Sequence, residues 1–254
     1  MPDGAKDPDG QELQRADPMP RYRDTAAGIP DLPASLQVYE ALRARIVSLS
    51  LAPGARLSRP ELAEQFGVSA SPLREALLRL ERDGLIATFR QSRTVVTHID
   101  PGQVKREHFL RTAIECEVVN ALAAKPDKSV LSKAAAIIRM QRVLLEDAEQ
   151  MEMFRKLDED FHRELFEAAE QGDLHRSLLE QSSQMARLRS IDLPSEGKSA
   201  SVVEGHARVM EAIQASDRHG ATDAMRGHLS GTISRLEQIM AQHPQFFVAG
   251  GEGA

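Results

Sequence analysis

The stretch from Leu57 to Gly84 limits what this chain can fold into more than any other part, because it predicts two short helices joined by a tight turn. Ser58 and Glu61 have the S-x-x-E spacing of a capping box, which satisfies free backbone donors at a helix start. Gly67 predicts the end of the first helix, since glycine adopts left-handed backbone angles at little cost. Ser71 is the expected cap of the second helix, with a proline in its first turn.

The second of these helices has two different faces. Leu73, Ala76, Leu77 and Leu80 recur at helical spacing and should face a core, whereas Arg74 points elsewhere. This arrangement is typical of a helix-turn-helix, whose second helix enters the major groove of DNA. Two ordinary helices with a solvated arginine face would give the same pattern, so the flanking sequence has to decide between the two interpretations.

The flanks favour a DNA-binding domain. An amphipathic helix is expected over residues 35–50, and two β-prone runs, 85–89 and 94–98, surround the polar segment 90–93. Such a pair of runs predicts a hairpin, which would form the wing of a winged helix. We therefore expect a winged helix-turn-helix domain over residues 34–98.

Charge is distributed unevenly along the chain. The whole chain has a net charge of −6, which argues against nonspecific binding to nucleic acid. Residues 35–98 nevertheless contain nine arginines and six acidic residues, whereas the segments before and after them are acidic. A basic segment in an acidic chain indicates a DNA-binding module attached to a domain of another kind.

The rest of the chain predicts a second, helical domain. Residues 1–33, rich in Asp, Pro and Gly, should form a disordered leader, 99–102 a linker and 244–254 a flexible tail. Between the linker and the tail, residues 103–243 have helical periodicity. Breaks divide this region into about six helices, with expected spans of 103–124, 127–149, 151–170, 173–190, 198–217 and 219–241. The predicted fold class is mainly α, with an N-terminal winged helix-turn-helix domain and a C-terminal all-α antiparallel helical bundle.

Composition excludes several other classes of protein. The chain has one cysteine, Cys116, so it has no internal disulfide framework and suits the reducing cytoplasm. No apolar run approaches the roughly 20 residues of a membrane span, and no signal peptide is visible. We therefore expect a cytoplasmic protein with no membrane partner.

Two sets of motifs resemble one known family. The PG-x-x-L turn, LAEQFGVS, SPLREAL and LERDGL resemble the winged helix-turn-helix of the GntR family of bacterial transcription regulators. RTAIECEVVNALAA, LDEDFHRELF, EGHARVMEAI and MRGHL resemble the ligand-binding FCD domain of the FadR subfamily. The resemblance covers about residues 35–241. It implies a homodimer that binds palindromic, double-stranded operator DNA, with recognition helices about 34 Å apart.

The resemblance also implies which residues contact DNA. They lie at the start of the recognition helix, in the segment before the helix-turn-helix and at the wing, and they are Arg56, Arg59, Ser69, Ser71, Arg74, Arg90, Gln91 and Arg93. The chain departs from the family at Ala70, where an arginine often stands, and at the wing tip, which lacks the usual glycine. The family therefore does not supply the operator sequence.

Four residues of the helical domain suggest a metal site. Asp158 and His162 are four residues apart and so point to the same side of one helix, and His206 and His228 lie on the apolar faces of two later helices. Imidazole and carboxylate ligands suit zinc, nickel or manganese. Spacing alone does not bring the four together, and each histidine taken singly is better explained as an ordinary core or surface residue. The resemblance implies that all four bind a divalent transition metal, with zinc expected first.

Arg111 has two expected roles. Its spacing predicts an ion pair with Glu115 one helical turn later. The resemblance implies that it also binds a small carboxylate metabolite, because a guanidinium fork matches a carboxylate. The expected function is therefore transcription regulation, as a repressor released by this effector, rather than catalysis. Two alternatives stay open, namely a regulator for which the metal ion is itself the signal and, less expected because no general base stands out, a metalloenzyme.

Overall fold

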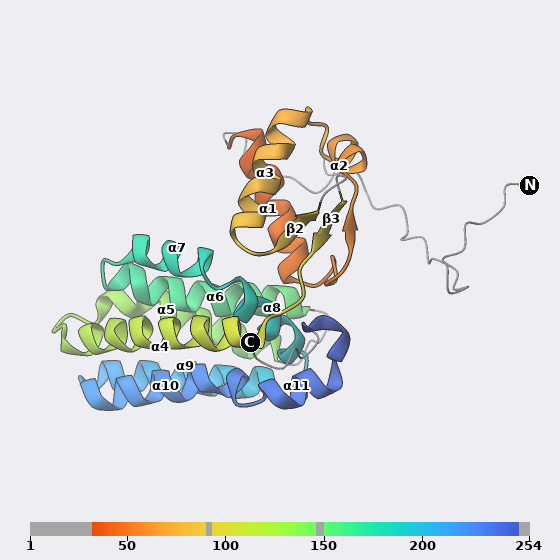
Figure 1. Cartoon of the computed structure of the whole chain (residues 1–254). Helices are drawn as coiled ribbons and strands as arrows, with labels where there is room; N and C mark the ends of the chain where they lie inside the picture. The colour runs from red at the N-terminus through yellow and green to blue at the C-terminus, as the bar shows by residue number, and fades with distance from the viewer. Residues whose placement is uncertain (1–31, 90–92, 146–149, 249–254) are drawn as a thin grey trace, which may run out of the picture.

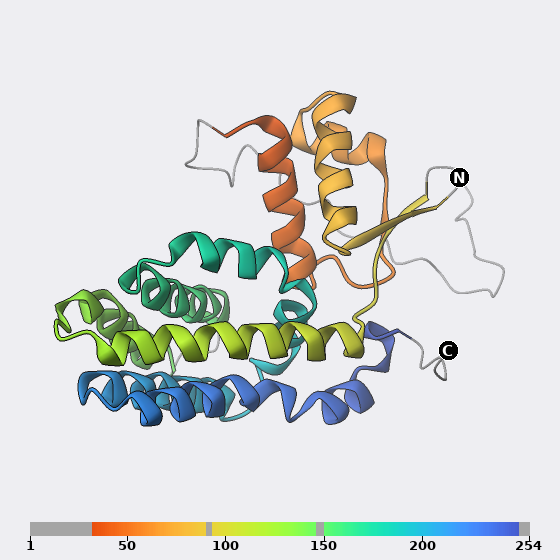
Figure 2. The same ribbon diagram turned by 60° about the vertical axis from the view of Figure 1, so that its left-hand side comes forward.

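The computed structural model of the chain describes residues 32–89, 93–145 and 150–248. It confirms the predicted fold class, because a small winged-helix part lies against a larger bundle of helices (Figures 1 and 2). The elements in chain order are α1 (Ala34–Val47), β1 (Arg56–Leu57), α2 (Arg59–Phe66), α3 (Ala70–Arg82), β2 (Ile86–Phe89), β3 (Arg93–Val96), α4 (Pro101–Ala124), α5 (Ser132–Leu144), α6 (Met151–Ala168), α7 (Gly172–Glu180), α8 (Ser183–Asp192), α9 (Lys198–Gln214), α10 (Arg218–Ile233) and α11 (Leu236–Gln242), with 3₁₀ turns at Ser129–Leu131 and Pro244–Phe246.

The winged-helix part is built as its apolar pattern predicts. Leu73, Ala76, Leu77 and Leu80 of α3 are all buried, and they join α1 and the sheet in one hydrophobic cluster. Gly67 ends α2 at a φ of 63°, the left-handed conformation expected of it. The antiparallel sheet has the strand order β1-β3-β2. The sequence pattern missed β1, because a strand of two residues is too short to show alternation.

Two details of the helix starts differ from the prediction. Ser58 is the N-cap residue of α2, but its side chain makes no capping hydrogen bond, so the predicted capping box does not form. The N-cap residue of α3 is Ser69 and not Ser71, because the helix already begins at Ala70. Ser69 has extended backbone angles, and Ser71 lies exposed in the first turn.

The helical part is organised around the long helix α4. Figure 1 shows α9 and α10 along one side of α4 and α5, α6 and α7 toward the other. Helix α4 contacts α10, α9, α8 and α6, and α5 packs on α6 and α9. Apolar residues of α4, α5, α6, α9 and α10 form one buried cluster. The faces of α6, α9 and α10 that converge in this cluster also carry the predicted metal ligands. In the described residues, no helix is both long and apolar enough to cross a membrane.

Two of the expected helices are each divided in two. The span 173–190 forms α7 and α8, and the span 219–241 forms α10 and α11. Neither break falls at a glycine or proline, so local sequence did not indicate it. Tertiary contacts accompany both breaks. The redirected α8 buries Arg187 completely and aims its end residue Asp192 at Arg235, which stands at the second break, with 3.3 Å between Asp192 Oδ1 and Arg235 Nε.

The expected linker and the start of the expected tail are packed together. The N–H of Ile99 donates to the carbonyl of Phe246 at 2.9 Å, and the N–H of Val248 donates to the carbonyl of Ile99 at 3.0 Å. Ile99 and Phe247 are buried in a cluster that also contains Leu188 of α8. The prediction of a flexible tail from residue 244 is therefore wrong for residues 244–248. Ile99 of the linker is held by this segment through hydrogen bonds and by α8 through apolar packing. Residues 1–31 of the expected leader and 249–254 of the expected tail lie outside the described residues.

The winged-helix and helical parts are joined by further hydrogen bonds. Figure 2 shows the end of α7 beside the lower end of α1, where Nη2 of Arg43 donates to the carbonyl of Leu179 at 3.0 Å. Arg187 of α8 donates through Nη1 to the carbonyl of Thr97, just after β3, at 2.6 Å. Helices α7 and α8 therefore contact both the first helix and the sheet of the winged-helix part.

Candidate functional site

The predicted DNA-binding residues of the recognition helix lie on one exposed face. Ser69, Ser71 and Arg74 are all exposed at the start of α3. Arg56 is exposed on β1. The exposed start of α3 is the part of a recognition helix that contacts base edges in a helix-turn-helix. Ala70, the position at which an arginine often stands in the family, is also exposed there.

The other predicted DNA contacts are less uniform. Arg59 begins α2 half-buried, and its Nε is buried without a hydrogen-bond partner. Arg93 is exposed, with its guanidinium carbon 5.0 Å from the centre of the Phe89 ring. Arg90 and Gln91 lie outside the described residues. Among the ion pairs of the described residues, none involves the arginines on this surface, so their positive charge is available to phosphate groups. These arginines are Arg56, Arg59, Arg74 and Arg93.

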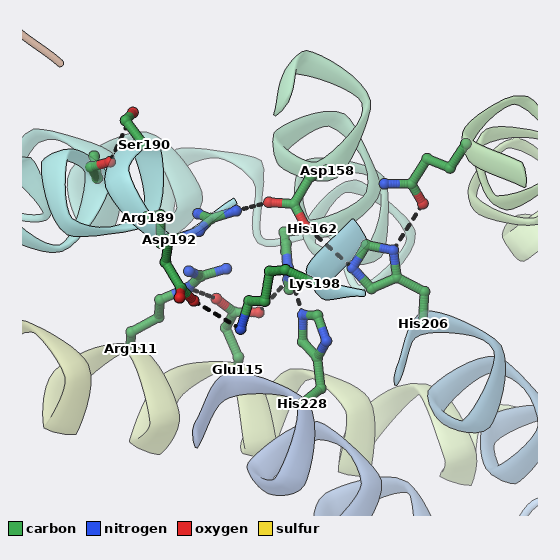
Figure 3. A network of polar contacts seen from close by, with 12 residues as sticks. Arg111, Glu115, Asp158, His162, Arg189, Ser190, Asp192, Lys198, His206 and His228 are labelled. Carbon is green, nitrogen blue, oxygen red and sulfur yellow. Dashed lines mark hydrogen bonds and ion pairs between the residues drawn. The ribbon is translucent and has the colours of Figure 1, made fainter. Parts of the chain in front are cut away.

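The four predicted metal ligands come together in the helical part. Asp158 and His162 of α6 meet His206 of α9 and His228 of α10, and Figure 3 shows their side chains pointing toward one another. One donor atom from each residue lies within 4.8 Å of all the others. The first three residues are buried and His228 is half-buried. Sequence spacing could not bring these three helices together, whereas their packing does.

Neighbouring side chains fix the orientation of two of the imidazoles. Nδ1 of His162 lies 2.5 Å from Oε2 of Glu115, and Nδ1 of His206 lies 2.8 Å from Oε1 of Gln141. An acceptor oxygen at Nδ1 favours the tautomer that carries its proton there, which leaves the Nε2 lone pair directed into the cluster. Partners of this kind orient histidine ligands in metal sites and raise their basicity.

Helix α10 reaches the cluster because of a glycine. Gly205 precedes His206 on α9, and a Cβ atom at this position would lie 2.6 Å from Nδ1 of His228. That separation is too short for any side chain to be accommodated without movement of the imidazole. Gly205 therefore allows the close approach of His228, whereas Gly227 on α10 has open space around it.

The electrostatic environment keeps the imidazoles neutral. Burial lowers the pKa of His206 and His228 well below 6.5, and the neighbouring histidines lower it further. Burial also lowers the pKa of His162. Burial alone would raise the pKa of Glu115, but the charge of Arg111 and the hydrogen bond from His162 reverse this effect and hold the pKa well below its usual range. A neutral imidazole held by an ionised carboxylate is the form that binds a metal.

Two pairs of donor atoms have the separation expected around a single divalent ion. Metal–nitrogen bonds of about 2.0–2.1 Å place neighbouring ligand atoms roughly 3.0–3.4 Å apart. Nε2 of His162 lies 3.2 Å from Nε2 of His228, and Nε2 of His206 lies 3.4 Å from Oδ1 of Asp158. Nε2 of His206 is also buried without a hydrogen-bond partner, which is costly unless another group binds there. Three imidazoles and one carboxylate match the preferences of zinc, nickel or manganese.

Two cavities adjoin the cluster. The larger, of about 60 Å³, is lined on the cluster side by Glu115 and His162, and the smaller, of about 40 Å³, by Asp158 and His228. Met185 and three arginines, Arg111, Arg155 and Arg189, line both cavities. Figure 3 shows Arg111 and Arg189 on one side of the cluster.

Arg111 stands where both of its expected roles require it to be. Its Nε lies 2.5 Å from Oε1 of Glu115, so the predicted ion pair is present, and the side chain also lines both cavities. Sequence reasoning missed Arg189, which pairs with the carboxylate of Asp158, and it missed Gln141. Neither had a signal in the sequence, because each reaches the cluster from a helix that contributes no ligand.

Two family models match the chain. The model described as bacterial regulatory proteins of the gntR family matches residues 34–96, and the FCD domain model matches residues 108–231. An HTH-type transcriptional regulator in an unstable DNA locus of Streptomyces ambofaciens is 33% identical over 211 residues, which are 83% of this chain and 88% of that protein. The HTH-type transcriptional repressor RspR of Escherichia coli K12 is 29% identical over 218 residues, covering 86% of this chain and 95% of RspR.

Solved structures share the fold. E. coli McbR/YncC has a TM-score of 0.69 at 21% identity and covers 82% of this chain and 98% of its own. A GntR transcriptional regulator from Rhodococcus sp. RHA1 has a TM-score of 0.64 at 21% identity, with coverage of 82% and 97%. The two family models, the relative at 33% identity and a winged helix joined to a helical bundle agree with one another. The chain therefore belongs to the GntR family of bacterial transcription regulators and carries an FCD domain after its winged helix-turn-helix.

Proposed function

We propose that this regulator is a homodimeric repressor of the FadR subfamily whose affinity for operator DNA is controlled by a small carboxylate bound at a metal centre in the FCD domain. The observation that carries the proposal is the convergence of four donor atoms within 4.8 Å beside arginine-lined cavities. The repressor role is supported by the name of the relative RspR. The domain boundaries we propose follow the sequence expectations, except that the FCD domain extends through residue 248.

Operator contact is assigned to the exposed start of α3 and to the wing. Ser69, Ser71 and Arg74 would meet base edges and phosphates in the major groove, while Arg56, Arg59 and the wing arginines would hold the DNA backbone. Contacts to phosphate give affinity that falls steeply with salt. A guanidinium that forks onto guanine contributes about 1–3 kcal/mol of sequence discrimination.

The metal centre is assigned to Asp158, His162, His206 and His228. Glu115 and Gln141 would hold two of the imidazoles with Nε2 free. A divalent ion bound there supplies a Lewis-acidic position for a ligand oxygen. The guanidinium of Arg111 would bind the same carboxylate from the cavity side, because it presents two parallel N–H donors. A small anion would thus be held by fixed positive groups at the centre of the domain.

The test uses the full-length protein and its metal content. After dialysis without chelator, we expect zinc, nickel or manganese at about one ion per chain in elemental analysis. His206→Ala should lose most of this metal, and so should Asp158→Asn. His219→Ala is the matched control, because it removes an exposed imidazole from α10 without touching the cluster. Equal metal content in all three variants would refute the centre.

A gel-shift titration separates the effector from the ion. With DNA fragments selected from a random pool, the metal-loaded protein should bind in the absence of small acids and release DNA when the correct carboxylate is added. Release of DNA by chelation alone, with no response to any carboxylate, would instead identify the ion itself as the signal.

A further inference from the structure

The larger cavity beside the metal cluster is closed by a helix of the winged-helix part. Arg43 and Val47, both on α1, line it together with residues of the FCD domain such as Glu115 and His162. Val47 is buried, with only 4% of its surface exposed, yet it belongs to none of the hydrophobic clusters found in the described residues. Its burial therefore comes from the contact between the two parts of the chain, at the cavity wall.

Arg43 differs from the other arginines around this cavity because its guanidinium has no carboxylate partner among the residues that the structure describes. Each of the others has a carboxylate partner: Arg111 pairs with Glu115, Arg155 with Glu152, and Arg189 with Asp158. In the described part of the chain, Arg43 forms no ion pair, and Nη2 donates to the neutral carbonyl of Leu179 at 3.0 Å.

The remaining carboxylate of the cavity wall, Glu159, forms no ion pair with Arg43 in the described residues. It acts electrostatically on Arg155, whose pKa is raised mainly by a hydrogen bond to Glu152 and further by Glu159. Arg43 therefore presents an uncompensated positive charge, with free N–H donors, at a wall formed by the other domain. A cavity with one of the proposed metal ligands, His162, at one wall and an unpaired guanidinium at another is suited to an anion with two separated acid groups.

We infer that the effector is a small dicarboxylate that bridges the two domains, with one carboxylate at the metal centre and Arg111 and the other on Arg43. The inference rests on the proposed effector site and adds to it the class of ligand and a binding residue outside the FCD domain. Because the ligand then contacts α1 directly, its binding free energy depends on where the winged helix sits. By linkage, ligand and DNA must then influence each other's affinity through α1.

The test compares acids of different length on the full-length, zinc-loaded protein by isothermal titration calorimetry. The probes are malonate, succinate and glutarate, with acetate as the single-carboxylate reference. We expect at least one of the dicarboxylates to bind more tightly than acetate. Arg43→Ala should weaken that dicarboxylate by about 10- to 100-fold, the usual effect of losing hydrogen bonds to a charged group, and leave acetate unchanged. Arg43→Lys, which keeps the charge without the fork, should fall in between.

Arg79→Ala is the matched control. Arg79 also joins the two parts of the chain, since its Nη2 lies 3.0 Å from Oε1 of Glu180, but it does not line the cavity. We expect its dicarboxylate affinity to stay within about twofold of that of the unaltered protein. Equal losses in Arg79→Ala and Arg43→Ala would show that Arg43 acts only through docking of the domains and would overturn the inference.

Two other results separate the inference from the function on which it rests. If dicarboxylates bind no better than acetate, or bind Arg43→Ala normally, the bridging ligand is wrong while the carboxylate site stands. If neither acetate nor any dicarboxylate binds the zinc-loaded protein, the proposed effector site itself fails.

Discussion

Oε2 of Glu115 lies 2.5 Å from Nδ1 of His162, so a carboxylate on α4 orients an imidazole on α6. The other oxygen of the same carboxylate pairs with Arg111, which lines both cavities. Glu115 thus connects the proposed metal ligand with the proposed effector-binding arginine. A change at this residue should affect both functions.

Glu115→Gln should lower the affinity for zinc by about 10- to 100-fold, the usual effect of removing a carboxylate that holds a histidine ligand. The amide still accepts a hydrogen bond from Nδ1 but no longer supplies a negative charge. Competition with a fluorescent zinc chelator measures the change. Glu117→Gln, on the exposed side of the same helix, serves as the control and should bind zinc normally. Unchanged zinc affinity in Glu115→Gln would remove this residue from the site.

Gly205→Ala should weaken metal binding by about 10-fold or more, because the added methyl group would displace His228 from the cluster. Gly227→Ala makes the same change where nothing lies within 4 Å of the new atom. There, alanine should stabilise α10 by up to about 1 kcal/mol through its higher helix propensity, with no effect on metal affinity. Zinc titrations should therefore show a loss of affinity in Gly205→Ala only, and thermal unfolding should show the gain in stability in Gly227→Ala. Equal zinc affinity in the two variants would contradict this account of Gly205.

Arg74→Ala should weaken specific operator binding and leave the fold intact, because the side chain is exposed at the start of α3. Loss of a base contact corresponds to about 1–3 kcal/mol, or roughly 5- to 150-fold in affinity. A gel-shift titration measures operator binding, and circular dichroism checks the fold. Arg82→Ala removes an exposed arginine from the other end of the same helix and should bind DNA nearly as the unaltered protein does. Full operator affinity in Arg74→Ala would disprove its assignment.

His175 should make the metal-free protein less stable in acid. Burial lowers its pKa from 6.5 to about 4, with a further contribution from His162. Below pH 6.5 the unfolded chain therefore takes up a proton that the folded chain excludes. The free energy of unfolding should fall by about 1–3 kcal/mol as the pH drops from about 6.5 to 4. Above pH 6.5, where His175 is neutral in both states, it should cause no such loss.

Urea unfolding in the presence of chelator tests this pH dependence. His175→Phe keeps an aromatic ring beside Phe166, whose ring centre lies 5.1 Å from that of His175, and should flatten the dependence. His219→Phe alters an exposed histidine and should leave the slope unchanged. An identical slope in His175→Phe and the unaltered protein would show that His175 does not titrate in this way.

The elements that could be predicted from sequence are those whose signal is local. Leu73, Leu77 and Leu80 mark the buried face of α3, and Gly67 marks the end of α2. The four predicted metal ligands could be grouped because the resemblance supplied the three-dimensional proximity that helical spacing lacks. The two breaks before α8 and α11 were missed, since neither contains a glycine or proline and both accompany contacts between distant residues.

The surroundings of the ligands could not be predicted for a related reason. Gln141, Arg189 and Arg43 each come from a separate helix and have no motif of their own. Arg43 looked like one of several arginines of a basic DNA-binding domain. Only the docking of α1 over α7 and α8 turns it toward a cavity of the other domain.

The pairing of Ile99 with the segment around Phe247 also sets an order of events during synthesis. The ribosome makes the winged helix first and Ile99 soon afterwards, but the residues that hold Ile99 emerge almost 150 positions later. Until then a nascent chain can complete its DNA-binding core while that core is still attached by an unsecured connection. The connection between the winged helix and the helical bundle thus takes its final form only once residues 246–248 have been translated.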